Sequence, residues 1–190
     1  MKHIKHILLV ITLVFTSGGA FGEVVEAKDL VEREGLRYKK FSNLPFSGEF
    51  SGNFFVDGSY IKGQYINGVR EGVWEYYFNS GKSVGQLNKV GNFKNGNQDG
   101  LWKGYFLGQL ATISNFKDGK RHGQYKVYHV LIKRDHKPED RSFQVKYGGN
   151  YINGKQNGLW EFFNVDGSLK GTKIYRNGVL IKENGVLISD

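Results

Sequence analysis

Cysteine is absent from this chain of 190 residues, and proline occurs only 2 times. Without thiols the chain cannot be a disulfide-stapled small protein. Its scarcity of proline excludes collagen, which also needs glycine at every third residue. Intrinsically disordered chains are poor in aromatic residues, whereas this chain has 3 Trp, 11 Tyr and 14 Phe beside 27 Gly. We therefore expect a single folded domain with many turns and aromatic strands.

The sequence also lacks the usual signatures of an enzyme. It has no cysteine nucleophile, no G-x-S-x-G, no Walker phosphate loop and no H-E-x-x-H. His122, His129 and His136 lie in one region, but their spacing matches no common metal site. Carboxylate pairs such as Glu71 and Glu75 have no constant counterpart elsewhere in the chain. We expect no catalytic residues, no metal and no cofactor.

The first 22 residues differ in character from the rest. Lys2 and Lys5 precede the apolar run 7–15, and small residues follow at 17–22. A basic start, a short apolar stretch and small residues are typical of a secretory signal peptide, and a run this short does not span a bilayer, which takes about 20 residues. No Cys follows the run, which excludes bacterial-type lipid attachment. We expect export, cleavage near Gly22, and no transmembrane span in the mature chain.

Residues 23–190 would then be the mature protein, located in the periplasm or secreted from a bacterium. Of the 27 Lys and Arg residues, 25 remain after cleavage, against 18 Asp and Glu, so the formal charge falls from +9 to +7. This balance favours contact with an anionic envelope surface or an acidic protein partner. We expect no nucleic-acid partner, and the sequence leaves the oligomeric state open.

A fifteen-residue pattern occurs four times without gaps, starting at Gly63, Gly91, Ser114 and Gly149. It reads G-x-aromatic-x-[N/D]-G-x-x-x-G-x-aromatic-x-x-aromatic. A partial fifth copy follows at 175–178, and a degenerate half-copy precedes the array at 48–58. The array therefore occupies 46–190, after an N-terminal segment at 23–45, and a loop insertion at 133–142 interrupts its period.

Each copy indicates a β-hairpin. Asn-Gly or Asp-Gly between alternating aromatic segments is the strongest short-range hairpin signal, because both turn positions need positive φ. Further turns at 79–81 and 165–167 connect one copy to the next. The pattern predicts an all-β meander of antiparallel hairpins. The glycines assigned to turns are Gly68, Gly72, Gly96, Gly100, Gly119, Gly123, Gly154 and Gly158.

The motif Y-x-N-G-x-x-x-G-x-W-x-x-Y resembles the MORN repeat, specifically the bacterial MORN-variant repeats of YwqK-type antitoxin-like proteins. The resemblance covers about 36–182 and includes the segments 36–41 and 45–48 before the array. It implies an elongated, twisted antiparallel sheet of stacked hairpins that serves as a scaffold without catalysis of its own. The chain departs from the pattern at Tyr125, where other copies have Trp, and at the insertion.

The repeated aromatics admit two interpretations. They could fill the thin core that a single-sheet repeat protein needs, or they could form an exposed ladder that stacks on sugars or bases. We favour the core. Its predicted members are Tyr65, Trp74, Tyr77, Phe93, Trp102, Tyr105, Phe116, Tyr125, Tyr128, Tyr151, Trp160 and Phe163.

The triplets between the two conserved glycines vary: Val-Arg-Glu at 69–71, Asn-Gln-Asp at 97–99, Lys-Arg-His at 120–122 and Lys-Gln-Asn at 155–157. Dissimilar polar residues at equivalent sites are typical of solvent-facing loops. The alternative is a row of contact residues along one edge, whose basic members would be Arg70, Lys120, Arg121 and Lys155.

Three functions follow from these observations. The leading hypothesis is an exported, non-enzymatic binding or scaffold module for an envelope protein or an anionic surface. The second is an antitoxin-like protein that neutralises a toxin, and the third is hydrolysis of cell-wall glycans. The apolar C-terminal run at 179–188 would cap the array or pair with another copy.

Overall fold

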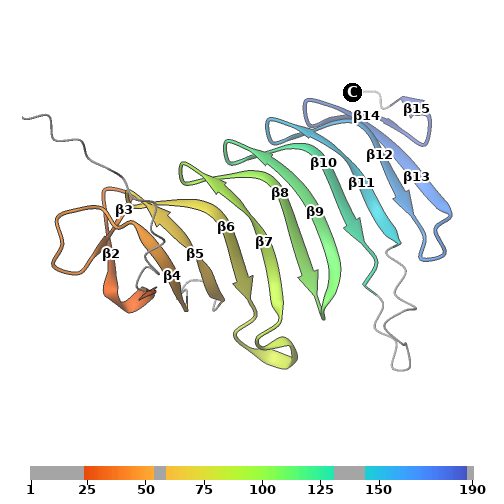
Figure 1. Cartoon of the computed structure of the whole chain (residues 1–190). Helices are drawn as coiled ribbons and strands as arrows, with labels where there is room; N and C mark the ends of the chain where they lie inside the picture. Colours follow the sequence, from red (N-terminus) through yellow and green to blue (C-terminus); the bar gives the residue numbers. More distant parts are fainter. Residues whose placement is uncertain (1–23, 54–58, 131–143, 188–190) are drawn as a thin grey trace, which may run out of the picture.

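The computed structural model describes residues 24–53, 59–130 and 144–187, and it shows a long open sheet of consecutive hairpins (Figure 1). The predicted signal peptide at 1–22 and the insertion at 133–142 lie outside the described residues. Within the described ranges, strands β1 and β4–β15 form one 13-stranded sheet in the order β1-β4-β5-β6-β7-β8-β9-β10-β11-β12-β13-β14-β15. The prediction of an all-β antiparallel sheet of stacked hairpins is confirmed.

The N-terminal segment supplies β1 (Val25–Glu26), the 3₁₀ turn η1 (Ala27–Asp29) and the separate hairpin β2 (Leu30–Arg33) and β3 (Leu36–Lys39). Strand β1 runs parallel to β4 (Gly48–Asn53), whereas the later pairs of the sheet are antiparallel. The β2–β3 hairpin packs on the first repeat, since Arg37 N–H donates to the Gly68 carbonyl at 2.9 Å. It therefore closes one end of the array.

Each copy of the sequence pattern is one hairpin. The five hairpins follow one another across Figure 1 with their turns along the same edge of the sheet. They consist of β5 (Tyr60–Ile66) and β6 (Val69–Tyr77), β7 (Leu87–Lys94) and β8 (Asn97–Phe106), β9 (Gln109–Lys117) and β10 (Lys120–Tyr128), β11 (Val145–Ile152) and β12 (Lys155–Phe163), and β13 (Leu169–Arg176) and β14 (Val179–Glu183). The 3₁₀ turn η2 (Gly81–Ser83) lies between β6 and β7.

The predicted turns have the conformation that their sequence requires. Both central residues have positive φ, for example 49° at Asn67 and 80° at Gly68, or 50° at Asp118 and 77° at Gly119. This is the two-residue turn that matches the twist of the flanking strands. The same geometry recurs at 95–96, 153–154 and 177–178. The turn assignment of Gly68, Gly96, Gly119 and Gly154 is confirmed.

The second glycine of each copy lies within a strand, so its assignment to a turn is wrong. Gly72 has φ of 69° inside β6, where the register with β5 passes from Lys62↔Glu75 to Gln64↔Glu71. The extra residues of β6 form a bulge, which needs left-handed backbone and therefore glycine. Three further glycines have φ of 70°, 96° and 75° at the same position of their copies, namely Gly100, Gly123 and Gly158.

The C-terminal run continues the sheet. Strand β14 pairs with β13, and β15 (Val186–Leu187) pairs with β14 through Lys182 and Glu183. Val186 and Leu187 remain exposed. The segment thus lengthens the array by one short strand.

Candidate functional site

One face of the sheet carries a buried row of rings, which we call the aromatic ladder. Trp74, Trp102 and Trp160 expose only 0%, 5% and 1% of their surface. Edge-on contacts join each Trp to the ring before it, with centroids 5.1 Å apart for Tyr65–Trp74, 5.2 Å for Phe93–Trp102 and 5.2 Å for Tyr151–Trp160. Phe116 and Tyr125 are half-buried members of the same row, and Phe116 contacts Trp102 at 6.1 Å. This face has the packing of a core.

A glycine lies beneath each tryptophan of the aromatic ladder. A Cβ built on Gly149 would stand 2.5 Å from Cδ2 of Trp160, and those on Gly63 and Gly91 would overlap the rings of Trp74 and Trp102. The third copy has Ser114 and Tyr125 at these two positions. The smaller ring therefore occurs where the glycine is replaced. Sequence reasoning missed this role, although the glycine opens three of the four copies.

The third aromatic of each copy lies on the opposite face, which we call the second face. Tyr77 pairs across the strands with Tyr60, whose ring is 6.3 Å away, while the neighbouring pair Ile61 and Tyr76 is buried in the core. Trp74 and Tyr77 are three residues apart, and side chains alternate along a strand, so they cannot share a face. The predicted core residues are therefore divided between the two faces. Four of them lie half-buried outside the aromatic ladder, namely Tyr77, Tyr105, Tyr128 and Phe163.

Two of the four basic residues singled out in the sequence lie over rings. The Arg70 guanidinium stands 4.8 Å from the Trp74 ring centroid and 5.2 Å from that of Phe93. Arg121 takes the equivalent place, 5.0 Å from the Tyr125 centroid and 5.5 Å from that of Tyr151. Such cation–π contacts stabilise each pair by about 0.5–1 kcal/mol at exposed sites. Lys120 and Lys155 are exposed.

The variable triplets begin strands, so their interpretation as loops is wrong. Their second residue accepts a backbone hydrogen bond from the turn glycine of the next copy: Gly96 N–H donates to Arg70 O at 3.0 Å, and Gly154 N–H to Arg121 O at 2.8 Å. The carboxylate of Glu71 accepts from Asn95 N–H at 2.8 Å. The triplets therefore join consecutive turns into one continuous edge.

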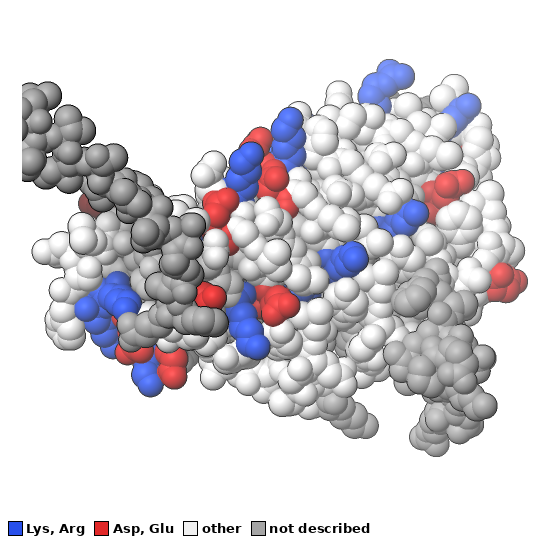
Figure 2. All heavy atoms as spheres, in the orientation of Figure 1, with Lys and Arg blue, Asp and Glu red and all other residues white. Residues whose placement is uncertain are grey.

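We call this edge the tip edge: the five Asn-Gly or Asp-Gly turns with the three residues on either side. It holds seven cationic residues and three acidic ones. The cationic residues are Arg70, Lys94, Lys117, Lys120, Arg121, Lys155 and Arg176; the acidic ones are Glu71, Asp99 and Asp118. Lys and Arg atoms are visible at the upper margin of Figure 2, where Figure 1 places the turns. The structure thus gathers the basic residues that the sequence singled out on one edge.

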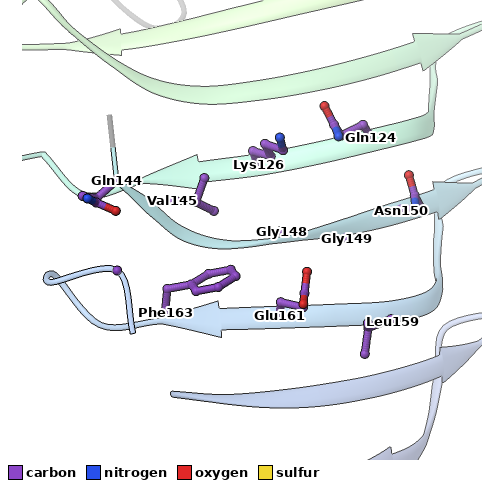
Figure 3. A pocket seen from close by; sticks show the side chains of 11 residues that line it. Gln124, Lys126, Gln144, Val145, Gly148, Gly149, Asn150, Leu159, Glu161 and Phe163 are labelled. Carbon is purple, nitrogen blue, oxygen red and sulfur yellow. The ribbon is translucent and has the colours of Figure 1, made fainter. Parts of the chain in front are cut away.

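The second face has a hollow near each end of the sheet. The C-terminal hollow, of about 540 Å³, is lined by Gln124, Lys126, Asn150, Glu161 and Phe163 among others. Figure 3 shows these side chains on β10, β11 and β12, with no side chain at Gly148 and Gly149 in the middle of β11. The N-terminal hollow, of about 620 Å³, is lined by Glu49, Tyr60, Lys62, Gln64 and Glu75 among others.

The carboxylate of Glu75 is held in place by its neighbours. Tyr77 Oη donates to Glu75 Oε2 at 2.7 Å, and this hydrogen bond raises the pKa of Tyr77 to about 12. Lys62 Nζ lies 5.2 Å from the Tyr77 ring centroid, which brings an ammonium group onto the same surface. The N-terminal hollow therefore presents the Glu75 carboxylate, the Lys62 ammonium group and the Tyr60 ring together.

The described histidines make local contacts. His122 Nδ1 lies 3.2 Å from Asn153 Oδ1, and His129 Nε2 lies 3.2 Å from the Phe163 carbonyl; His136 falls outside the described ranges. No group of three His, Asp or Glu side chains suited to a metal occurs in the part of the chain that the structure describes. In that same part, no helix has the length and apolar character to cross a membrane.

Comparisons with known proteins identify no family. No family model matches the chain, and no curated protein matches it. Among solved structures, the crystal structure of TarM covers 60% of this chain with 15% identity and a TM-score of 0.36. An S. aureus TarM mutant in complex with fondaparinux, alpha-GlcNAc-glycerol and UDP gives 14% identity and the same TM-score. This chain spans only 20% of the length of either one.

Proposed function

We propose that the protein is an exported, non-enzymatic binding module whose tip edge docks on an anionic envelope surface. The observation that carries the proposal is the excess of cationic over acidic side chains on that edge, seven against three. The aromatic ladder is already occupied in packing the sheet, whereas the lysines of the tip edge, such as Lys117, Lys120 and Lys155, are exposed.

The third turn contributes a group of exposed positive charges to the tip edge. Lys117, Lys120 and Arg121 are exposed there, with Asp118 as the acidic residue between them. Lysines near an anionic lipid surface contribute about 1 kcal/mol each, and salt screens the attraction. Several such residues on one continuous edge add up to stable contact.

The proposal also assigns the protein to a specific family. The repeat formula and its hairpins support a MORN-variant protein of the bacterial envelope, and the basic and apolar start of the chain supports export. An acidic envelope protein is the alternative occupant of the tip edge. An antitoxin-like role would instead require a toxin in the same compartment.

Vesicle binding tests the proposal. The purified protein is sedimented with vesicles of phosphatidylcholine alone or mixed with phosphatidylglycerol, at low and high salt. We expect binding only to the anionic vesicles and release at high salt. The variant K117E/K120E/K155E should lose about 3 kcal/mol of binding, roughly a hundredfold in affinity.

The matched control reverses three exposed lysines away from the tip edge, as K40E/K146E/K170E. Both variants change the net charge equally, so a difference between them reports position and not total charge. Arg70 and Arg121 are left unchanged because they pack on rings. Equal losses in both variants, or binding to neutral vesicles, would contradict docking through the tip edge.

A further inference from the structure

The two hollows of the second face occupy equivalent positions in the repeat. In the C-terminal hollow, Lys126, Gly148 and Glu161 are register partners across three adjacent strands. In the N-terminal hollow, Ser51, Lys62 and Glu75 take the same three places. Beside them, Gln124 pairs with Asn150, and Glu49 pairs with Gln64. The repeat has therefore placed a hollow at the same register position twice, with the glutamate on the third strand in both and the lysine on the first strand in one and the middle strand in the other.

Each hollow contains the glutamate of a copy that reads Gly-x-Trp-Glu. The acidic residue after the ladder Trp is Glu75 in the first copy and Glu161 in the fourth. The second and third copies have Lys103 and Lys126 at that position. The carboxylate is thus a variable feature of the second face, and each of the two copies that have it contributes it to a hollow.

The chemistry of the hollows suits a ligand that both donates and accepts hydrogen bonds. Each contains an ammonium group, which only donates, a carboxylate, which only accepts, and an amide, which does both. The opposite charges lie in the same hollow, and Glu49 adds a further carboxylate to the N-terminal one. This mixture disfavours a simple anion or cation and favours neutral hydroxyl groups.

A ring forms part of each hollow and supplies an apolar surface. Phe163 lines the C-terminal hollow, and Tyr60 lines the N-terminal one. Aromatic rings offer large flat contact areas, as the C–H faces of a sugar ring require. The volumes of about 540 and 620 Å³ fall within the range of small-molecule sites, about 300–1,000 Å³.

We propose that the two hollows are equivalent binding sites for a neutral, hydroxyl-rich glycan chain. Strands β5 and β11 are six positions apart in the sheet, and strands are spaced about 4.8 Å apart, so the sites stand about 29 Å from each other. One long polysaccharide can reach both, and joining two weak sites in this way raises the overall affinity. These sites share only the amides Gln64 and Asn150 with the tip edge and none of its charged residues, so they do not depend on its function.

Calorimetric titration of the full protein with chitohexaose, cellohexaose and maltohexaose tests the proposal. We expect at least one of the three sugars to bind with two sites per chain. The variant E161K should leave one site, and E75K/E161K should leave none. Because lysine occupies the equivalent position in two natural copies, both variants should fold, which circular dichroism and a thermal melt would check.

Two controls distinguish this proposal from docking through the tip edge. The variant K103E changes the equivalent position in a copy that lines neither hollow, and it should retain two sites. K117E/K120E/K155E should also retain two sites, whatever it does to vesicle binding. Absence of heat with all three sugars at millimolar concentration, or two sites remaining in folded E75K/E161K, would overturn the proposal.

Discussion

At the scale of single residues, the core depends on pairs of a tryptophan and the glycine beneath it. The rings of Trp74, Trp102 and Trp160 occupy the space that a side chain would take at Gly63, Gly91 and Gly149. The third copy pairs a serine with the smaller ring of Tyr125. The two positions are coupled because interiors are close-packed and neither side chain can grow without displacing the other.

This coupling predicts a non-additive pair of substitutions. Gly91→Ser should destabilise the protein by about 1–3 kcal/mol, as overpacking of a core does. In the background of Trp102→Tyr, which restores the pairing of the third copy, the same substitution should cost less. Urea unfolding of the four proteins in this cycle measures the difference. Equal costs in both backgrounds would show that the ring and the glycine are independent.

At the scale of the hairpin, the sequence predicted the turns well because their requirement is local. Asn-Gly and Asp-Gly meet the demand for positive φ within two residues. The turn between β8 and β9 was not predicted, since it places Leu107 at φ of 51° before Gly108. Leucine in this conformation is unfavourable by roughly 1–2 kcal/mol, and nothing in its type indicates a turn.

Leu107 therefore offers a stabilising substitution. Leu107→Asn should raise the free energy of unfolding by about 1 kcal/mol, because asparagine tolerates left-handed backbone. The reverse change at the matched position, Asn95→Leu with φ of 50°, should lower it by a similar amount. Thermal melts of both variants check the signs. A loss of stability in Leu107→Asn would mean that packing of the leucine outweighs the strain of its backbone.

It was harder to predict which side chains of each strand face the core than to predict where the strands turn. The second glycine of each copy adds residues to one strand of the pair, and this bulge sets which later side chains face the core. The repeat formula shows the glycine and the aromatics but not the pairing between strands. The formula also joined Tyr77 and Phe163 with Trp74 and Trp160, although a spacing of three residues along a strand puts them on opposite faces.

At the scale of the whole molecule, the sheet is a linear array of hairpins in sequence order. Each hairpin contacts its neighbours through ladder rings and through turn hydrogen bonds such as Gly119 N–H to Gln98 O at 2.9 Å. Stability in such arrays is the sum of each repeat and its interfaces. The sequence predicted this architecture because the pattern repeats. A row of basic residues along one edge was one of the two interpretations that the sequence left open, whereas the two hollows required the register between strands.

The central claim is that the aromatic ladder is the core and that binding occurs on other surfaces. Trp102 is its most direct test, since its ring contacts Phe93 at 5.2 Å and Phe116 at 6.1 Å and its Nε1–H donates to Asn92 O at 3.0 Å. Urea unfolding of Trp102→Ala should show a loss of about 3–5 kcal/mol, while the folded fraction still binds anionic vesicles. A midpoint close to that of the wild type, together with lost binding, would contradict the account and make the ladder a ligand platform.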